Sequence, residues 1–308
     1  MRTMQKKSRY KDSRQRQVYT MIAIPLLLVF TFCYLPMFGV VIAFKDYRFD
    51  TGIIGSKWVG FDNFKFLFKT PDFLRITWNT LYMNFLFITI GTIAAIIIAI
   101  VLFELKSRAA TKVFQTILIT PNFLSWVIVS YMVYGFLNPS YGLINTLFVK
   151  FGIGAVDWYN EPKYWPAILV VCSVWKNVGM DSVIYYAALM GIDHSIYEAA
   201  DIDGASKLKK VWYITIPEIT SIISIMIILK IGGIFRADFG LFYQVPRNVG
   251  ALYSKTDVVD TYIFRALTQI GDMSMSAAIG LLQSVVGLVM VLITNYITKK
   301  INPDNAMF

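Results

Sequence analysis

The chain has 308 residues, of which 56% are hydrophobic and 16% charged, whereas soluble domains average about 45–50% and about 25%. A soluble globule of this size could not bury so much apolar surface, so the composition excludes a soluble enzyme, a disordered chain and a disulfide scaffold. The net charge of +10 is compatible with nucleic-acid binding, but the basic residues gather beside an apolar run, which favours a membrane protein without a nucleic-acid partner.

The N-terminal tail, residues 1–19, holds seven basic residues and one acidic residue, which together give +6 of the net +10. Basic residues beside a membrane span face the cytoplasm. The apolar run after this tail is about 24 residues long and has no small-residue cleavage site, so it is predicted to be a membrane span rather than a cleaved signal peptide.

Six apolar segments are each close to the ~20 residues that a helix needs to cross ~30 Å of hydrocarbon. Because backbone polar groups in lipid must pair with one another, each segment is predicted to be a helix, and the fold to be all-α. The predicted spans are 20–44, 80–103, 113–137, 165–190, 217–235 and 276–298.

Loop charges predict the orientation of these spans. The short loop 104–112 carries lysine and arginine, and the loop 191–216 and the C-terminal end 299–308 carry lysine. With six crossings, both termini and these loops share the cytoplasmic side, and 45–79 and 236–275 lie outside. The transmembrane domain is therefore predicted to cover 20–298, between the basic tail and the cytoplasmic end.

Small residues recur every four positions in two of the spans. This spacing lets helix backbones approach closely, although it also arises by chance in spans rich in small residues. The two sets are Gly91, Ala95 and Ala99, and Ser276, Gly280 and Ser284.

Polar side chains inside the spans cost free energy and therefore need a reason. In the fourth span, Ser173, Asn177, Asp181 and Tyr185 recur every four residues. The third span has a similar row: Asn122, Trp126, Ser130 and Tyr134. One hypothesis is a wet cavity lined by such side chains; the other is hydrogen bonding between helices. Lys230 could pair with Asp181 or extend its stem toward the interface. The candidate pathway residues are Trp126, Asn177, Asp181, Tyr185 and Lys230.

The loop before the fifth span predicts a docking element. Ser195 and Glu198 have the spacing of a helix capping box, and Gly204 permits the positive φ of a turn. A second amphipathic stretch runs into Pro217, which suits the first turn of a helix. A helix–turn–helix on the cytoplasmic side suits a groove on a partner.

The spacing of this loop resembles a known signature. Glu198-Ala199-Ala200, Gly204, Ile214 and Ile216-Pro217 match the EAA motif of permease subunits in binding-protein-dependent ABC importers. Further stretches resemble the carbohydrate branch of that family, in particular oligosaccharide and polysaccharide permeases of the LplB type: Trp58–Phe64, Trp175-Lys176 and Asp260–Tyr262.

The resemblance implies a type I importer permease with six transmembrane helices in the bacterial cytoplasmic membrane. It also implies a second homologous permease, two ATPase subunits that use ATP and magnesium, an extracytoplasmic solute-binding protein and a carbohydrate substrate. The chain itself would have no catalytic residue, cofactor or metal. The implied ATPase-coupling positions are Glu198, Ala199, Ala200, Asp203 and Gly204.

Three other functions compete with this one. A related permease could carry an amino acid or a phosphate ester, and a gated channel would need no coupling loop. A membrane enzyme would need paired carboxylates or a metal motif; Asp257 and Asp260 are available but are expected on a solvated face, and His194 is the single histidine.

Overall fold

The computed structural model describes residues 2–70, 72–105, 107–301, 303 and 306. Within this part, four helical segments are long and apolar enough to cross a membrane, and two bent helix pairs bring the number to six. The prediction of an all-α, multi-span fold is confirmed. The four unbroken segments are Gln17–Phe44, Asp72–Phe103, Pro162–Leu189 and Met273–Ile301.

The predicted third span, 113–137, is not a single helix, whereas most of the predicted fifth span, 217–235, is the single helix Thr220–Gly232, which follows a bend at its start. Arg108–Phe123 and Trp126–Leu137 meet at 97°, and Lys207–Glu218 and Thr220–Gly232 meet at 61°. The third span breaks because Ser125 leaves the helical conformation and its hydroxyl caps a new helix by accepting from the Ile128 N–H. The row from Asn122 to Tyr134 is therefore divided between two helices and does not run along a single span.

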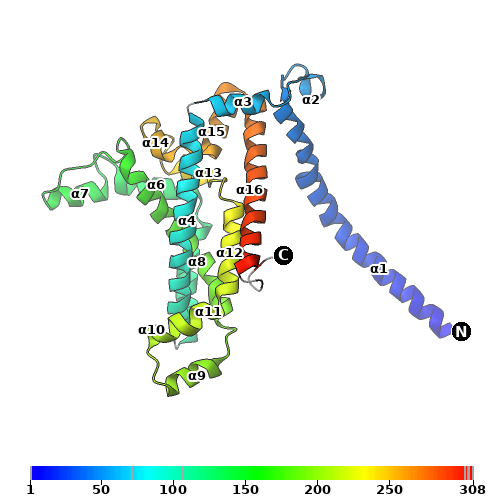
Figure 1. Ribbon diagram of the computed structural model, residues 1–308, viewed down its shortest axis with the longest axis vertical. Coiled ribbons are helices and arrows are strands. Elements are labelled where there is room, and N and C mark those ends of the chain that lie inside the picture. Colours follow the sequence, from blue (N-terminus) through cyan, green and yellow to red (C-terminus); the bar gives the residue numbers. More distant parts are fainter. Residues whose placement is uncertain (1, 71, 106, 302, 304–305, 307–308) are drawn as a thin grey trace.

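Two unbroken helices, α4 (Asp72–Phe103) and α8 (Trp165–Leu189), pack together along the centre of the molecule (Figure 1). Ala95 and Ala99 of α4 are fully buried in one cluster with Leu189 of α8. Helix α5 (Arg108–Ile119) also approaches α8 closely, since a Cβ on Gly179 would collide with the Leu118 backbone. Small residues thus set these helix contacts, as expected for the second span.

The sixth span uses a different small residue from those predicted. Where α12 (Thr220–Gly232) meets α16 (Met273–Ile301), Gly287 faces the Gly232 carbonyl, and a Cβ at 287 would lie 2.7 Å from that oxygen. Gly280 faces open space and Ser284 is exposed. Gly280 and Gly287 are seven residues apart and so lie on nearly the same face of α16, and the close approach occurs two turns beyond Gly280.

The first helix stands apart from the rest of the chain (Figure 1). Helix α1 (Arg2–Val29) continues through a π-helical turn, η1 (Phe30–Tyr34), into the 3-10 helix η2 (Leu35–Phe44), and only η2 packs on α16. A two-stranded antiparallel hairpin follows, β1 (Lys45–Asp46) and β2 (Lys57–Trp58), with α2 (Gly52–Gly55) between its strands and α3 (Asp62–Lys69) after it.

Shorter elements gather at the two ends of the bundle, called here the α3 end and the α9 end (Figure 1). Four elements follow α5 along the chain before α8 begins: η3 (Thr120–Phe123), α6 (Trp126–Leu137), α7 (Leu143–Lys150) and η4 (Pro162–Tyr164). The α9 end holds α9 (His194–Ile202), α10 (Lys207–Lys210), η5 (Val211–Thr215) and α11 (Ile216–Glu218). Toward the α3 end lie α13 (Phe239–Gln244), η6 (Gly250–Leu252), α14 (Tyr253–Thr256), α15 (Val259–Arg265) and η7 (Ala266–Ile270).

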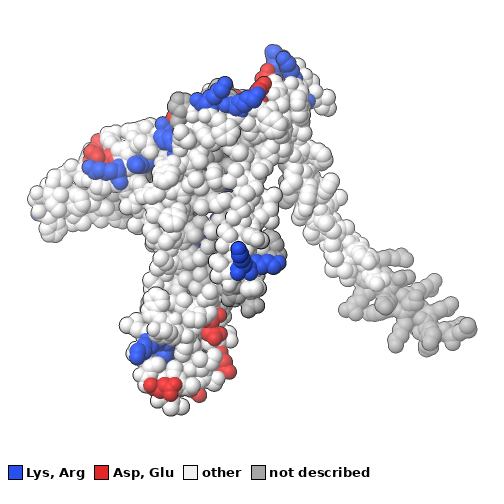
Figure 2. Space-filling model, in the orientation of Figure 1, with Lys and Arg blue, Asp and Glu red and all other residues white. Residues whose placement is uncertain are grey.

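Charged side chains also gather toward the two ends of the bundle. Figure 2 shows lysine, arginine, aspartate and glutamate at the two ends of the molecule and around the end of α16, with a wide uncharged zone between them. A surface of this kind suits hydrocarbon, where an exposed charge is costly. The uncharged zone therefore marks the membrane-embedded part of the molecule.

Candidate functional site

A polar cavity of about 280 Å³ lies between α4, α8 and α12. Helix α8 contributes most of its polar lining because Ser173, Asn177 and Asp181 are spaced four residues apart and share one face. Apolar and aromatic side chains supply the remaining wall. The lining residues are Asn84, Phe87, Ile88, Gly91, Ser173, Val174, Asn177, Val178, Asp181 and Lys230.

An ion pair crosses this cavity. The Lys230 ammonium of α12 lies 2.6 Å from the Asp181 carboxylate of α8. The two side chains are 24% and 25% exposed, so each is partly desolvated. Lys230 therefore pairs with Asp181 and does not extend toward the interface, because an unpaired charge inside a span would be costly.

A second set of contacts leads from the cavity to α13. Asn122 donates to the side-chain oxygen of Asn177 at 3.2 Å, and Lys176 donates to the Asn122 carbonyl at 2.6 Å. The Lys176 ammonium also lies 5.3 Å from the centroid of the Trp126 ring, a cation–π contact. Trp126 in turn donates through its indole N–H to Asp238 at 2.7 Å. Trp126 is thus held on both sides, between a lysine of α8 and the N-cap carboxylate of α13.

Two members of this set, Lys176 and Asp238, were neither predicted site residues nor part of the predicted polar rows. Lys176 lies one position before Asn177 and is 92% buried, since its exposed fraction is 8%. A lysine inside an apolar span is itself a signal of function or pairing, and it could have identified this residue. Asp238 follows the fifth span, and nothing in the spacing connects it with Trp126.

Tyr185 does not line the cavity. Its side chain is fully buried in the cluster that holds Ala95, Ala99 and Leu189. The reason is geometric: four residues turn a helix by about 400°, so each step along the row rotates away from the face of Ser173. Tyr185 belongs to the α4–α8 packing, and its predicted place in the cavity is wrong.

Amide and carboxylate groups hold the segment that follows α12. Asn84 of α4 donates to the carbonyl oxygens of Ile234 and Arg236 at 2.8 and 3.0 Å, just beyond the end of α12. Asp260 accepts from the Ala237 N–H at 2.7 Å and from Gln283 at 3.2 Å. Burial raises the pKa of Asp260 above its ordinary value. The segment after α12 is therefore tied to both α4 and α16.

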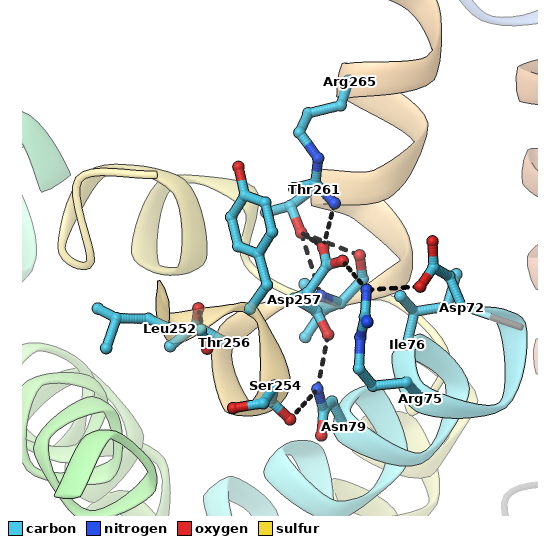
Figure 3. A network of polar contacts seen from close by, with 12 residues as sticks. Asp72, Arg75, Ile76, Asn79, Leu252, Ser254, Thr256, Asp257, Thr261 and Arg265 are labelled. Atoms are coloured by element: carbon cyan, nitrogen blue, oxygen red, sulfur yellow. Dashed lines mark hydrogen bonds and ion pairs between the residues drawn. The ribbon is translucent and has the colours of Figure 1, made fainter. Parts of the chain in front are cut away.

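Asp257 is the centre of a buried network at the same end (Figure 3). Its carboxylate is fully buried and lies 3.1 Å from Arg75 of α4 and 2.6 Å from Arg265 of α15. Thr261 donates to the same carboxylate at 2.9 Å, and Asn79 donates to the Asp257 backbone carbonyl at 2.9 Å. The expectation of a solvated face is wrong for this residue, because α4 supplies two partners from a distant part of the chain.

At the other end of the bundle, α9 carries the motif that resembles a coupling helix. Its cap is Asp193, whose carboxylate accepts from the Ser195 backbone N–H at 3.0 Å. This hydrogen bond lowers the pKa of Asp193 below its ordinary value. The predicted capping box of Ser195 and Glu198 is therefore wrong by two positions. The predicted turn is confirmed, since Gly204 has a φ of 70°.

Contacts on one side of α9 hold it against the bundle. Tyr197 shares a hydrogen bond of 3.0 Å with Thr215, and Lys210 pairs with Asp201 at 2.8 Å. The Phe103 ring at the end of α4 lies 5.8 Å from that of Tyr197. These contacts position α9 without covering its outer face.

The predicted coupling residues lie on the uncovered side. Glu198, Ala199, Asp203 and Gly204 are exposed and Ala200 is half-buried. Ile202, at the end of α9, is 88% exposed beside them. A rigid helix with small residues and a protruding isoleucine suits insertion into a complementary groove.

Comparisons with known proteins agree with these features. The family described as "Binding-protein-dependent transport system inner membrane component" matches residues 88–303. Protein LplB of Bacillus subtilis (strain 168) is 35% identical over 94% of this chain and 91% of its own length. The polygalacturonan/rhamnogalacturonan transport system permease protein YteP of the same organism is 34% identical over 94% and 90%.

A solved structure has the same fold. A chain in the crystal structure of a bacterial ABC transporter involved in the import of the acidic polysaccharide alginate matches with a TM-score of 0.85 and 32% identity. The match covers 95% of this chain and 99% of that chain. The chain described here therefore belongs to the family of binding-protein-dependent transport system inner membrane components.

Proposed function

We propose that this chain is one of two permease subunits of an ATP-driven importer of oligosaccharides or polysaccharides. The second subunit would be a homologous permease, and an extracytoplasmic binding protein would deliver the sugar. Support for the substrate class comes from YteP and from the alginate transporter, both similar over more than nine-tenths of this chain. We further propose that the α9 end and both termini lie in the cytoplasm, in agreement with the basic loops at 104–112 and 191–216.

The observation that carries the proposal is the connection between α9 and the polar cavity. Helix α8 runs from the cavity residues directly into the loop before α9, and α12 returns from the α9 end to Lys230. A movement of α9 would therefore act on two walls of the cavity. This arrangement suits a subunit in which a cytoplasmic ATPase biases the equilibrium between two states of the pathway.

The exposed side of α9 is the proposed ATPase contact. In both states of the ATPase, a groove on that partner would hold the coupling residues of α9 and the turn after it. These residues are Glu198, Ala199, Ala200, Asp203 and Gly204. ATP and magnesium would be bound by the partner, and this chain would transport without a cofactor or a catalytic residue of its own.

The polar cavity is the proposed sugar pathway. Asn177 and the Asp181–Lys230 pair would bond sugar hydroxyl groups, and Trp126 would stack on the apolar face of a sugar ring. Each of these groups already has a protein partner, so a passing sugar would exchange hydrogen bonds rather than satisfy empty ones.

Co-purification tests the coupling proposal. The tagged chain is extracted from its native membrane in mild detergent, together with the variants Glu198→Lys and Gly204→Pro. We expect an ATPase and a second permease with the unmodified chain, and loss of the ATPase alone with either variant. Glu161→Lys, the same charge reversal at an exposed site outside α9, is the matched control and should retain both partners. Retention of the ATPase by all variants would contradict the assignment of α9.

Uptake tests the substrate class. Vesicles with the assembled transporter and its binding protein are given labelled alginate oligosaccharides, polygalacturonan fragments, neutral oligosaccharides, amino acids and glycerol phosphate. We expect ATP-dependent uptake of a carbohydrate, and flux that persists without ATP would instead indicate a channel.

A further inference from the structure

The arm between α6 and α8, residues 138–158, is ordered by hydrogen bonds within the segment. The side-chain oxygen of Asn138 accepts from the Ser140 and Tyr141 N–H groups at 2.9 and 3.1 Å. Asn145 of α7 is buried, donates to the Val156 carbonyl at 2.8 Å and accepts from the Trp158 indole at 3.0 Å. Because the buried Asn145 amide makes several hydrogen bonds to residues 156–158, these contacts fix the direction of α7 relative to that segment.

The two faces of α7 differ in their contacts. Ile144 and Phe148 turn inward, and the Phe148 ring lies 6.0 Å from that of Trp158 in the main hydrophobic cluster. Leu143 and Leu147 face the other way and are 51% and 43% exposed, and Phe151, just after the helix, is 79% exposed. Val149 and Ile153 add to this exposed apolar surface. A water-soluble loop would not be expected to present so many large apolar side chains together.

The position of the arm indicates what covers this face. Figure 1 shows α7 projecting sideways from the bundle, beyond α6. The first residue of α8 is Trp165, and its indole donates to the Trp158 carbonyl at 2.7 Å. Tyr159 and Tyr164 pack with these two tryptophans in a buried aromatic group that joins the arm to the start of α8.

Charge supports the same conclusion. The part of the arm that projects furthest is almost entirely uncharged in Figure 2, and Lys150 is the one charged residue of α7. Helix α6, which contacts α7 and is the second half of the bent α5–α6 pair, also exposes apolar side chains: Val127, Ile128 and Tyr131. An uncharged arm with large exposed apolar side chains, next to a helix that exposes others, is most simply covered by lipid.

We propose that α7 is an interfacial helix that lies along the membrane surface at the extracytoplasmic side, with Leu143, Leu147 and Phe151 in the lipid acyl boundary. The occupant of this face is thus lipid, and neither the second permease nor the binding protein. The side of the membrane rests on the proposed orientation, whereas contact with lipid does not. Because the arm is hydrogen bonded to the start of α8, its insertion would fix the depth of α8 in the membrane.

Spin labelling measures this depth directly. In a background with Cys33→Ser and Cys172→Ala, single cysteines replace Leu147 or Phe151, and Lys65→Cys on α3 serves as the water-exposed reference. The complete transporter is reconstituted in phosphatidylethanolamine–phosphatidylglycerol vesicles, and collisions of the label with oxygen and with a water-soluble nickel chelate are compared. A monodisperse size-exclusion profile of each labelled sample before reconstitution establishes that the labelled chain is folded.

We expect oxygen collisions to exceed nickel collisions at 147 and 151, and the reverse at 65. Nickel accessibility equal to that of position 65 would place the arm in water and overturn the proposal. Labels shielded from both reagents would show that a protein subunit covers α7, which would also overturn it. Failure of α9 to bind an ATPase would leave these three outcomes unchanged, so the two proposals are tested separately.

Discussion

The Asp181–Lys230 ion pair offers the sharpest test of the cavity. Replacing Lys230 by methionine keeps the length of the side chain but leaves the Asp181 carboxylate without its partner. Replacing Asp181 by asparagine does the same to the ammonium. The double variant removes both charges, so no uncompensated charge stays inside the membrane.

The structure sets the magnitude. Two unit charges 2.6 Å apart attract by roughly 6 kcal/mol at an effective dielectric constant of about 20, and most of this offsets the loss of hydration. Breaking a fully buried pair from one side costs about 3–5 kcal/mol. Because about a quarter of each side chain is exposed, we expect a loss of about 2–3 kcal/mol in each single variant. The double variant should recover most of it.

Thermal or denaturant unfolding of the purified transporter measures these differences as a double-mutant cycle. Lys65→Met is the matched control, since Lys65 pairs with Asp62 at 3.1 Å but both side chains are about two-thirds exposed. We expect that control to change stability by less than about 0.5 kcal/mol. If the losses in the two single variants simply add in the double variant, the two residues do not act as a pair and the reasoning is refuted.

Three further predictions follow from other contacts. Asp257→Asn should lower the free energy of unfolding by about 3–5 kcal/mol, whereas Asp72→Asn, at a half-exposed ion pair, should cost less than about 1 kcal/mol; equal shifts in thermal unfolding would contradict the buried network. Gly179→Ala should reduce the yield of monodisperse protein in size-exclusion chromatography, because its Cβ would meet the backbone of α5, and Gly91→Ala, with open space around it, should not; similar yields would contradict that close approach. Asp193→Ala should speed hydrogen exchange across α9. Since the folded pKa of Asp193 lies below its unfolded value, its contribution is complete at neutral pH and is lost as the pH falls through the lowered pKa; unchanged exchange in the variant would show that the cap is dispensable.

Hydropathy predicted the spans well where a helix is unbroken. The fourth predicted span, 165–190, differs from α8 by one residue, and the first ends at Phe44 as expected. Burial of an apolar segment in lipid and pairing of its backbone are local requirements, so composition alone reveals them. The breaks at Ser125 and Ile219 were not predicted, because a bent pair has the same mean hydropathy as a straight helix.

In the candidate site, too, some positions could be predicted from the spacing of residues and others could not. Asn177 and Asp181 could be assigned to one face from their spacing, and the pairing of Asp181 with Lys230 was one of two arrangements considered. Tyr185 belonged to the same row, yet the slow rotation of that row took it into the core.

By itself, the sequence determined the class of the protein, its apolar segments and the motif on α9, because each depends on residues within a few helical turns. Only the tertiary structure decided which polar groups meet. Arg75 reaches Asp257 across 182 positions, and Trp126 reaches Asp238 across 112. Such contacts depend on how helices pack in three dimensions, and no local periodicity encodes the position of a partner so far along the chain.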